Sequence, residues 1–111
     1  MSDLKVEILL PLRYNADKKG NRKKIEGEKF STTFEELVVK FGGCTINNTT
    51  LLGDWVDSTT QKRYKDENST YWVVCKKTKS NIEFFHRLKK KLKTRFQQKD
   101  MMIYYVTINR F

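Results

Sequence analysis

Carboxylates gather in the middle of the chain, where a metal ion is one conceivable occupant. Asp54, Asp57, Asp66 and Glu67 lie in one short stretch. Carboxylate oxygens are hard ligands that suit divalent cations, and a bound cation can activate water for phosphodiester cleavage. A small metal-dependent nuclease is therefore one open interpretation. Turn formation and solubility explain the same residues equally well, so we assign none of them as a metal ligand.

Other chemistry-bearing residues are sparse. His86 is the only histidine and falls on a predicted basic helix, which is a poor place for a metal ligand or a catalytic base. No nucleophile and base pair is assembled by spacing, and neither a glycine-rich phosphate loop nor a zinc-ligand set is present. We therefore assign no catalytic residue and no cofactor, and we expect a non-enzymatic protein.

Positive charge is the strongest chemical signal in the sequence. The formal net charge is +10, and nearly all of it lies in residues 13–29 and 80–98. Such an excess favours nucleic acid or an acidic protein surface as the partner. The leading hypothesis is a non-catalytic interaction module that uses helix 81–98 and loop 13–29. Its candidate binding residues are Arg22, Lys23, Lys24, Arg87, Lys90, Lys91 and Lys93.

The segment Ser80–Gln98 must position four of these seven cations. At 100° per residue its apolar side chains form one stripe, and the cations fall on the opposite face. Ser80 and Glu83 match a capping box, which predicts a helix start near residue 81. Lys89 is expected to lie along the apolar edge and Arg95 beside the basic face. The stripe consists of Phe85, Leu88, Leu92 and Phe96, with Ile82 and Phe84 at its borders.

The first third of the chain predicts a strand, a loop and a second helix. Residues 5–12 alternate between apolar and other side chains, as a strand does. Residues 13–29 have no period, and we expect a mobile basic loop. Residues 30–41 have the spacing of an amphipathic helix that ends at Gly42. Thr32 with Glu35, or Thr33 with Glu36, offers its capping box.

Residues 44–56 and 63–77 predict a long antiparallel hairpin. Its polar middle, in the tip region 51–68, contains Gly53 and predicts a bulge there. A turn centred between Thr59 and Thr60 places Ile46 opposite Val73 and Cys44 opposite Cys75. We expect these two cysteines to be reduced and buried. Residues 101–108 predict a last, apolar strand.

The order of elements predicts one α+β domain over residues 1–111. Strand, helix, two strands, helix and strand form the ferredoxin-like βαββαβ motif, a four-stranded antiparallel sheet with two helices on one face and strands one and three in its centre. Two swapped half-domains are the alternative. Strands three and four are apolar on both sides, so we expect homo-oligomerisation through the sheet face without helices.

One further signal lies in short motifs of the hairpin. Residues 30–108 resemble the PII/CutA-like superfamily in their order of elements. Three features carry the resemblance: the cysteine of GGCTINN, the tryptophan of GDWVDSTTQKRYKDEN, and the acidic residues before an apolar strand. The resemblance implies a trimer with sheets packed inside it and a functional loop at 51–68. An oligomeric small-ligand sensor is thus the second functional hypothesis, although the superfamily's glycine-containing nucleotide motif is absent. Asp17 has the approximate position of a carboxylate that some ferredoxin-like endoribonucleases share across a dimer.

The sequence also bears on location. No run approaches the roughly 20 apolar residues of a membrane-spanning helix, and the first residues have no basic region or cleavage site. We expect a cytoplasmic protein without a membrane partner.

Overall fold

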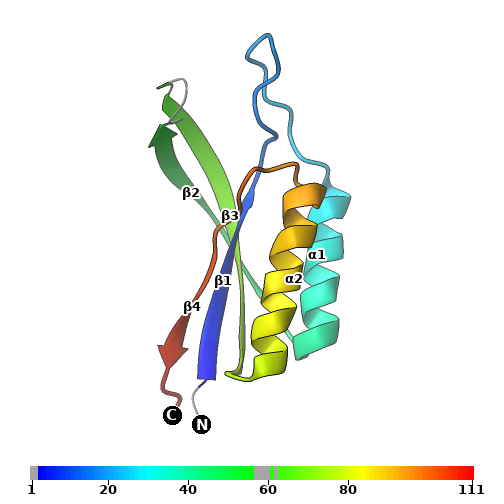
Figure 1. Cartoon of the computed structure of the whole chain (residues 1–111), viewed down its shortest axis with the longest axis vertical. Coiled ribbons are helices and arrows are strands. Elements are labelled where there is room, and N and C mark those ends of the chain that lie inside the picture. Colours follow the sequence, from blue (N-terminus) through cyan, green and yellow to red (C-terminus); the bar gives the residue numbers. More distant parts are fainter. Residues whose placement is uncertain (1–2, 57–60, 62) are drawn as a thin grey trace.

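The computed structural model describes residues 3–56, 61 and 63–111, and the side chains of residues 3–47, 61 and 67–111. Four antiparallel strands form one sheet in the order β2-β3-β1-β4, and both helices lie on the same face of it (Figure 1). The predicted ferredoxin-like α+β arrangement is confirmed, including the central position of strands one and three. The elements are β1 (Asp3–Pro11), α1 (Gly27–Phe41), β2 (Thr45–Val56), β3 (Arg63–Lys76), α2 (Lys79–Arg95) and β4 (Ile103–Ile108).

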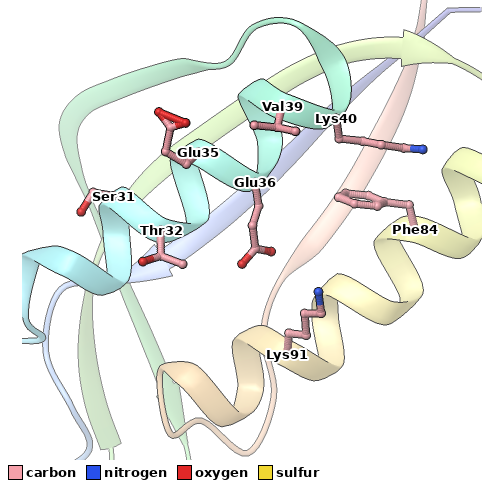
Figure 2. A pocket seen from close by; sticks show the side chains of 8 residues that line it. All are labelled: Ser31, Thr32, Glu35, Glu36, Val39, Lys40, Phe84 and Lys91. Carbon is pink, nitrogen blue, oxygen red and sulfur yellow. The ribbon is translucent and has the colours of Figure 1, made fainter.

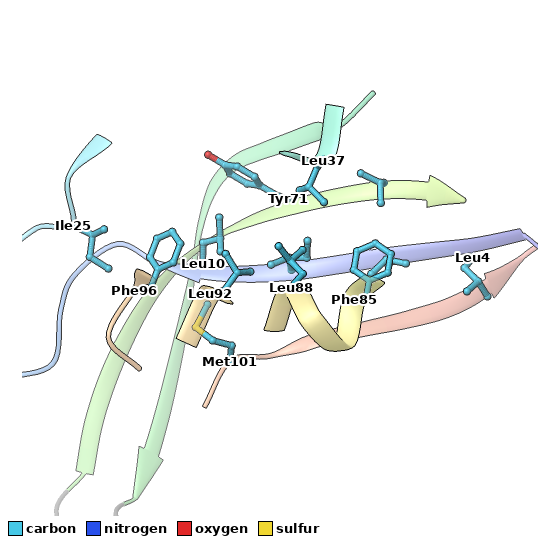
Figure 3. Close-up of a cluster of buried hydrophobic side chains, with 13 residues drawn as sticks. Leu4, Leu10, Ile25, Leu37, Tyr71, Phe85, Leu88, Leu92, Phe96 and Met101 are labelled. Atoms are coloured by element: carbon cyan, nitrogen blue, oxygen red, sulfur yellow. The ribbon is translucent and has the colours of Figure 1, made fainter. Parts of the chain in front are cut away.

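The core lies between the helices and one face of the sheet (Figure 3). The alternation predicted for the first strand is confirmed, because every second residue of β1 is buried. The apolar stripe of α2 packs against these side chains, and Met101 closes the core beside β4. Burying this much apolar surface is the main force that fixes the helices on the sheet. The largest fully buried side chains include Phe96, Leu4, Ile8, Leu10, Leu37, Leu88 and Leu92.

Helix α1 begins earlier than predicted. It starts at Gly27, so neither Thr32 nor Thr33 is its N-cap, and Glu26 precedes it without a side-chain cap. The Thr33 hydroxyl instead donates to the carbonyl oxygen of Lys29, 2.8 Å away inside the helix. The predicted stop is confirmed. Gly42 adopts φ +81° and its N–H donates to the Val38 carbonyl at 2.7 Å, a conformation that disfavours other residues.

Helix α2 has a different cap from the predicted one. Thr78 is the N-cap, and its hydroxyl accepts the N–H of Asn81 at 3.1 Å. The Ser80 and Glu83 capping box is therefore wrong, since both residues lie within the helix. The helix ends at Arg95, three residues before the predicted end, and Gln97 then adopts φ +53°.

The predicted hairpin pairs β2 with β3, but its register changes along the ladder. The outer half follows the predicted pairing, with Leu51 opposite Asn68. An irregularity between Asn47 and Leu51 shifts the inner half, so that Ile46 lies opposite Tyr71 rather than Val73. The bulge was predicted near Gly53, and the structure places it several residues earlier, between Asn47 and Leu51. The turn at residues 57–60 and 62 lies outside the described residues.

The two cysteines are not opposite each other, so their predicted pairing is wrong. Cys44 precedes β2, and Cys75 lies opposite Leu4 of β1. Both thiols are free, as predicted, and half-buried rather than fully buried.

The segment predicted as a basic loop contains its own backbone pairing. Arg13 and Lys24 form an antiparallel bridge, and the Tyr14 N–H donates to the Lys23 carbonyl at 2.8 Å. At its base the Ile25 N–H donates to the Leu12 carbonyl at 2.9 Å, and the Ile25 side chain is buried in the core. We call residues 13–24 the basic arm; Figure 1 shows it extending beyond the ends of the helices. Its mobility stays a prediction.

The sheet face without helices is partly apolar. Trp72 and Val74 of β3 point to this face, because their neighbours Tyr71 and Val73 are buried in the core. Trp72 is half-buried and the ammonium of Lys5 lies 4.7 Å from its ring centre. No helix in the described part of the chain is long and apolar enough to cross a membrane.

Candidate functional site

The outer surface of α2 carries the predicted basic face. Burial of Phe85, Leu88 and Leu92 fixes the rotation of the helix. Three of the predicted cations consequently point outward and are exposed, namely Arg87, Lys90 and Lys91. None of them forms an ion pair within the described residues. They are therefore available to an external anion.

Two other cations of α2, Lys89 and Arg95, pair with carboxylates, and a third, Lys93, is half-buried. Lys89 lies 3.1 Å from a carboxylate oxygen of Asp100, and its hydrogen bond is the main reason why the pKa of that carboxyl is lowered. Lys93 is half-buried, and its charge also lowers the pKa of Asp100. Arg95 donates to the Thr33 hydroxyl at 2.8 Å and forms an ion pair with Glu36. Arg95 therefore joins the two helices rather than extending the basic face.

A shallow groove of about 810 Å³ runs between the outer surfaces of the helices (Figure 2). Lys91 and Phe84 border it from α2, and Glu35 and Val39 from α1. The carboxylates of α1 limit the basic face on this side, because they repel an anion that approaches across the groove.

The basic arm contributes lysines rather than arginines. The Nε of Arg22 donates to the Tyr14 carbonyl at 3.0 Å, and a terminal nitrogen of Arg13 donates to the Arg22 carbonyl at 3.3 Å. Both arginines thereby hold the arm's own backbone. Lys23 and Lys24 are exposed, so they are the better candidates for contacts with a partner.

The arm and α2 meet at one end of the molecule. The side-chain amide of Asn15 donates to the carbonyl of Gln97 at 3.4 Å, which ties the base of the arm to the C-terminal end of α2. Figure 1 shows the arm beyond that end of the helix. The structure thus brings the two basic segments to a common end, while Arg87 lies farther down the helix.

A polar cluster at the base of the arm was not predicted. The hydroxyl of Tyr14 donates to Glu26 and lowers the pKa of that carboxyl, and it also raises the pKa of Lys29. The Lys29 ammonium lies 4.8 Å from the centre of the Tyr14 ring. Both charges are stabilised in their ionised forms, so the cluster braces the arm. The one signal of this cluster in the sequence is Tyr14, an aromatic residue within a segment rich in cations.

Three of the residues considered for catalysis have described side chains, namely Asp17, Glu67 and His86, and all three are exposed. Asp17 accepts the N–H groups of Lys19 and Asn21 at 2.8 and 2.9 Å, and so caps the turn of the arm. His86 is exposed on α2. Among the described residues, no three potential ligands lie together where a metal ion would bind. Asp54, Asp57 and Asp66 lie outside the described side chains, so the metal hypothesis for them stays a prediction.

Comparison with known proteins adds no family: no protein-family model and no curated protein matches the chain.

Proposed function

We propose that the chain is a small, non-catalytic interaction module that binds a polyanion, either nucleic acid or an acidic protein surface. The observation that carries the proposal is the exposed row of Arg87, Lys90 and Lys91, which has no ion pair in the described part of the chain. Lys89 and Arg95 on the same helix do have such partners, so the charge of the exposed row is left available to an external anion. Lys93 at its edge, and Lys23 and Lys24 of the basic arm, complete the proposed surface, whereas Arg22 holds the backbone of the arm.

Salt dependence of binding tests the proposal. A labelled oligonucleotide, single-stranded or duplex, is titrated with the protein while fluorescence anisotropy is recorded at several salt concentrations. Each neutralised phosphate contributes a slope of about 0.9 in log affinity against log salt on duplex DNA, or about 0.7 on single strands. Three or more contacts therefore predict a steep loss of affinity. An acidic polypeptide serves as the probe for the second partner class.

A charge-reversal pair identifies the surface. Lys90→Glu with Lys91→Glu is expected to lower affinity at least tenfold, because it replaces two attractive charges by two repulsive ones. Lys77→Glu with Lys79→Glu is the matched control, since both residues are exposed, lie at the other end of α2 and change the net charge equally. Equal affinities of the two variants, or no binding by the parent at low salt, would contradict the proposal.

The same titration separates the alternative functions. Magnesium-dependent cleavage of the oligonucleotide would indicate a nuclease. A thermal shift with a nucleotide, without binding to a polyanion, would indicate a PII/CutA-like sensor.

We also propose that the chain associates with itself through the sheet side that lacks helices. The support is apolar surface there, including Trp72 and Val74 of β3 and the exposed residues Tyr104 and Val106 of β4. Sedimentation at micromolar concentration measures the mass, and a strict monomer contradicts this proposal. The cytoplasm is the proposed location, because the free thiols of Cys44 and Cys75 suit a reducing compartment.

A further inference from the structure

Strand β4 is the last strand of the described sheet, and its apolar side chains are exposed on both faces. Between 41 and 59 % of each of Met102, Tyr104, Tyr105 and Val106 is accessible to solvent. Residues 101–108 include no charged residue and no proline. Charged residues and prolines are the usual features that prevent an edge strand from pairing with another chain, so β4 lacks this protection.

The backbone groups available at this edge can be identified. The Leu9 N–H donates to the Met102 carbonyl at 3.0 Å, which makes these two residues a hydrogen-bonded pair of the β1–β4 ladder. Such pairs alternate along an antiparallel ladder, so Tyr104 and Val106 also direct their N–H and C=O groups to β1. The intervening residues Ile103, Tyr105 and Thr107 direct theirs away from the sheet.

We propose that a second copy of this chain adds its own β4 antiparallel to this edge, which forms a two-fold symmetric dimer with one continuous sheet. This inference rests on the proposed self-association, but it places the contact at the edge of β4 instead of the open sheet face. The two-fold axis is perpendicular to the sheet, since antiparallel strands keep their faces on the same side.

A register centred on Tyr105 uses every outward backbone group. Tyr105 then lies opposite its own copy, and Ile103 opposite Thr107 of the second copy, with two hydrogen bonds in each such pair. On the sheet face without helices, Tyr104 lies opposite Val106 of the second copy. Such a pair of an aromatic and a β-branched residue stabilises sheets. All these cross-strand pairs lack charge.

Charges beyond the strand ends agree with this register. It brings Asp100 of each copy towards Arg110 of the other, and both side chains are largely exposed. The open face beside β4 is nearly neutral, because Lys5 pairs with Glu7 and Lys76 with Asp3, each at 3.6 Å. The cations available to a polyanion lie on α2 and on the arm. One exposed cation, Lys77, lies beside the strand, with its ammonium 6.0 Å from the centre of the Tyr105 ring. A second copy, which also carries +10, therefore meets less repulsion at β4 than at the outer face of α2 or at the arm.

Proline at an outward position tests the edge. Thr107→Pro removes an N–H that points away from β1, so the β1 ladder is retained. The parent is expected to sediment with twice the 13.3 kDa mass of the chain. The proline variant is expected to raise the dissociation constant about 10- to 100-fold through the loss of one hydrogen bond per copy. Thr107→Ala keeps the N–H and is expected to leave the dimer intact; circular dichroism checks that both variants fold.

Cysteine cross-linking tests the register independently of any change in stability. Under mild oxidation, Tyr105→Cys is expected to give a covalent dimer, because the two equivalent Cα atoms lie about 5.5 Å apart in a hydrogen-bonded pair, within disulfide range. Thr107→Cys is the control and is expected to stay uncross-linked, since its counterpart lies several residues farther along the strand.

The outcomes separate this inference from the proposals on which it rests. A monomeric parent overturns both the edge contact and the self-association. A dimer that persists in Thr107→Pro, and that Tyr105→Cys does not cross-link, overturns the edge contact alone and leaves a face contact. Neither outcome bears on polyanion binding.

Discussion

Among the described residues, Cys44 has a strongly shifted ionisation. Its thiol lies half-buried at the start of the hairpin, and desolvation raises its pKa to about 11. The thiolate is the reactive form of cysteine, so the folded protein holds Cys44 in an unreactive state at neutral pH.

We predict that alkylation of Cys44 follows this shifted pKa. In a Cys75→Ser variant, which leaves Cys44 as the single thiol, the rate should rise about tenfold per pH unit until close to pH 11. The denatured chain should instead level off near the reference pKa of 9.0. Because the folded state keeps its proton between these two values, stability should fall as the pH rises through that window. Saturation of the folded protein near pH 9 would contradict the prediction.

Arg95 shows why some site residues cannot be assigned from sequence. It was placed beside the basic face, and its position on the helix agrees with that. Its partners Thr33 and Glu36 lie on α1, and only the packing of the helices brings the three side chains together. Exposure of Arg87 and Lys90, by contrast, followed from helical spacing alone.

For the helices and strands, the spacing of apolar residues in the sequence predicted the type of each element. The boundaries of the helices depend on local hydrogen bonds at their ends. The strand alternation of β1 and the stripe of α2 were predicted because burial imposes a period on the sequence. The start of α1 was wrong because Glu26 precedes the helix without a side-chain cap, so no capping signal marks Gly27. The start of α2 was wrong because Thr78, two residues before Ser80, caps the helix without a Glu or Gln at residue 81. The inner hairpin register was wrong because the bulge after Asn47 has no glycine or proline signal.

We predict that Thr78, and not Ser80, stabilises the start of α2. Thr78→Ala should lower the free energy of unfolding by about 1 kcal/mol, since it leaves the Asn81 N–H without its side-chain acceptor. Ser80→Ala should change it by less than about 0.5 kcal/mol, as is usual for exposed positions. Urea unfolding measures both, and the reverse order would restore the capping box at Ser80.

Over the described side chains of the whole molecule, the proposed polyanion surface and the apolar strand edge occupy different elements. The cations of that surface lie on α2 and the arm, whereas four of the exposed large apolar side chains lie at residues 102–106, along β4. The proposed edge contact keeps the helix faces of both copies on one side of the joined sheet. A single long polyanion would then meet two rows of cations.

We predict that salt acts in opposite directions on the two proposed interactions. Rising salt should weaken polyanion binding through the loss of counterion release. It should strengthen self-association or leave it unchanged, because it screens the repulsion between two copies of charge +10. Anisotropy and sedimentation over the same salt series measure both. Weakening of the dimer by salt would mean that ion pairs, rather than the uncharged strand, hold it.

The hydrogen bond between Leu12 and Ile25 has a consequence for how this fold can vary. It brings the chain back to the point from which the arm departs, so the scaffold requires only that these two positions meet. Connections of other lengths and compositions can be spliced between them at a small entropic cost, because closing a loop depends only weakly on its length. The arm is thus a replaceable connection. If it binds a polyanion as proposed, exchanging it would change that contact while the sheet and helices stay as they are.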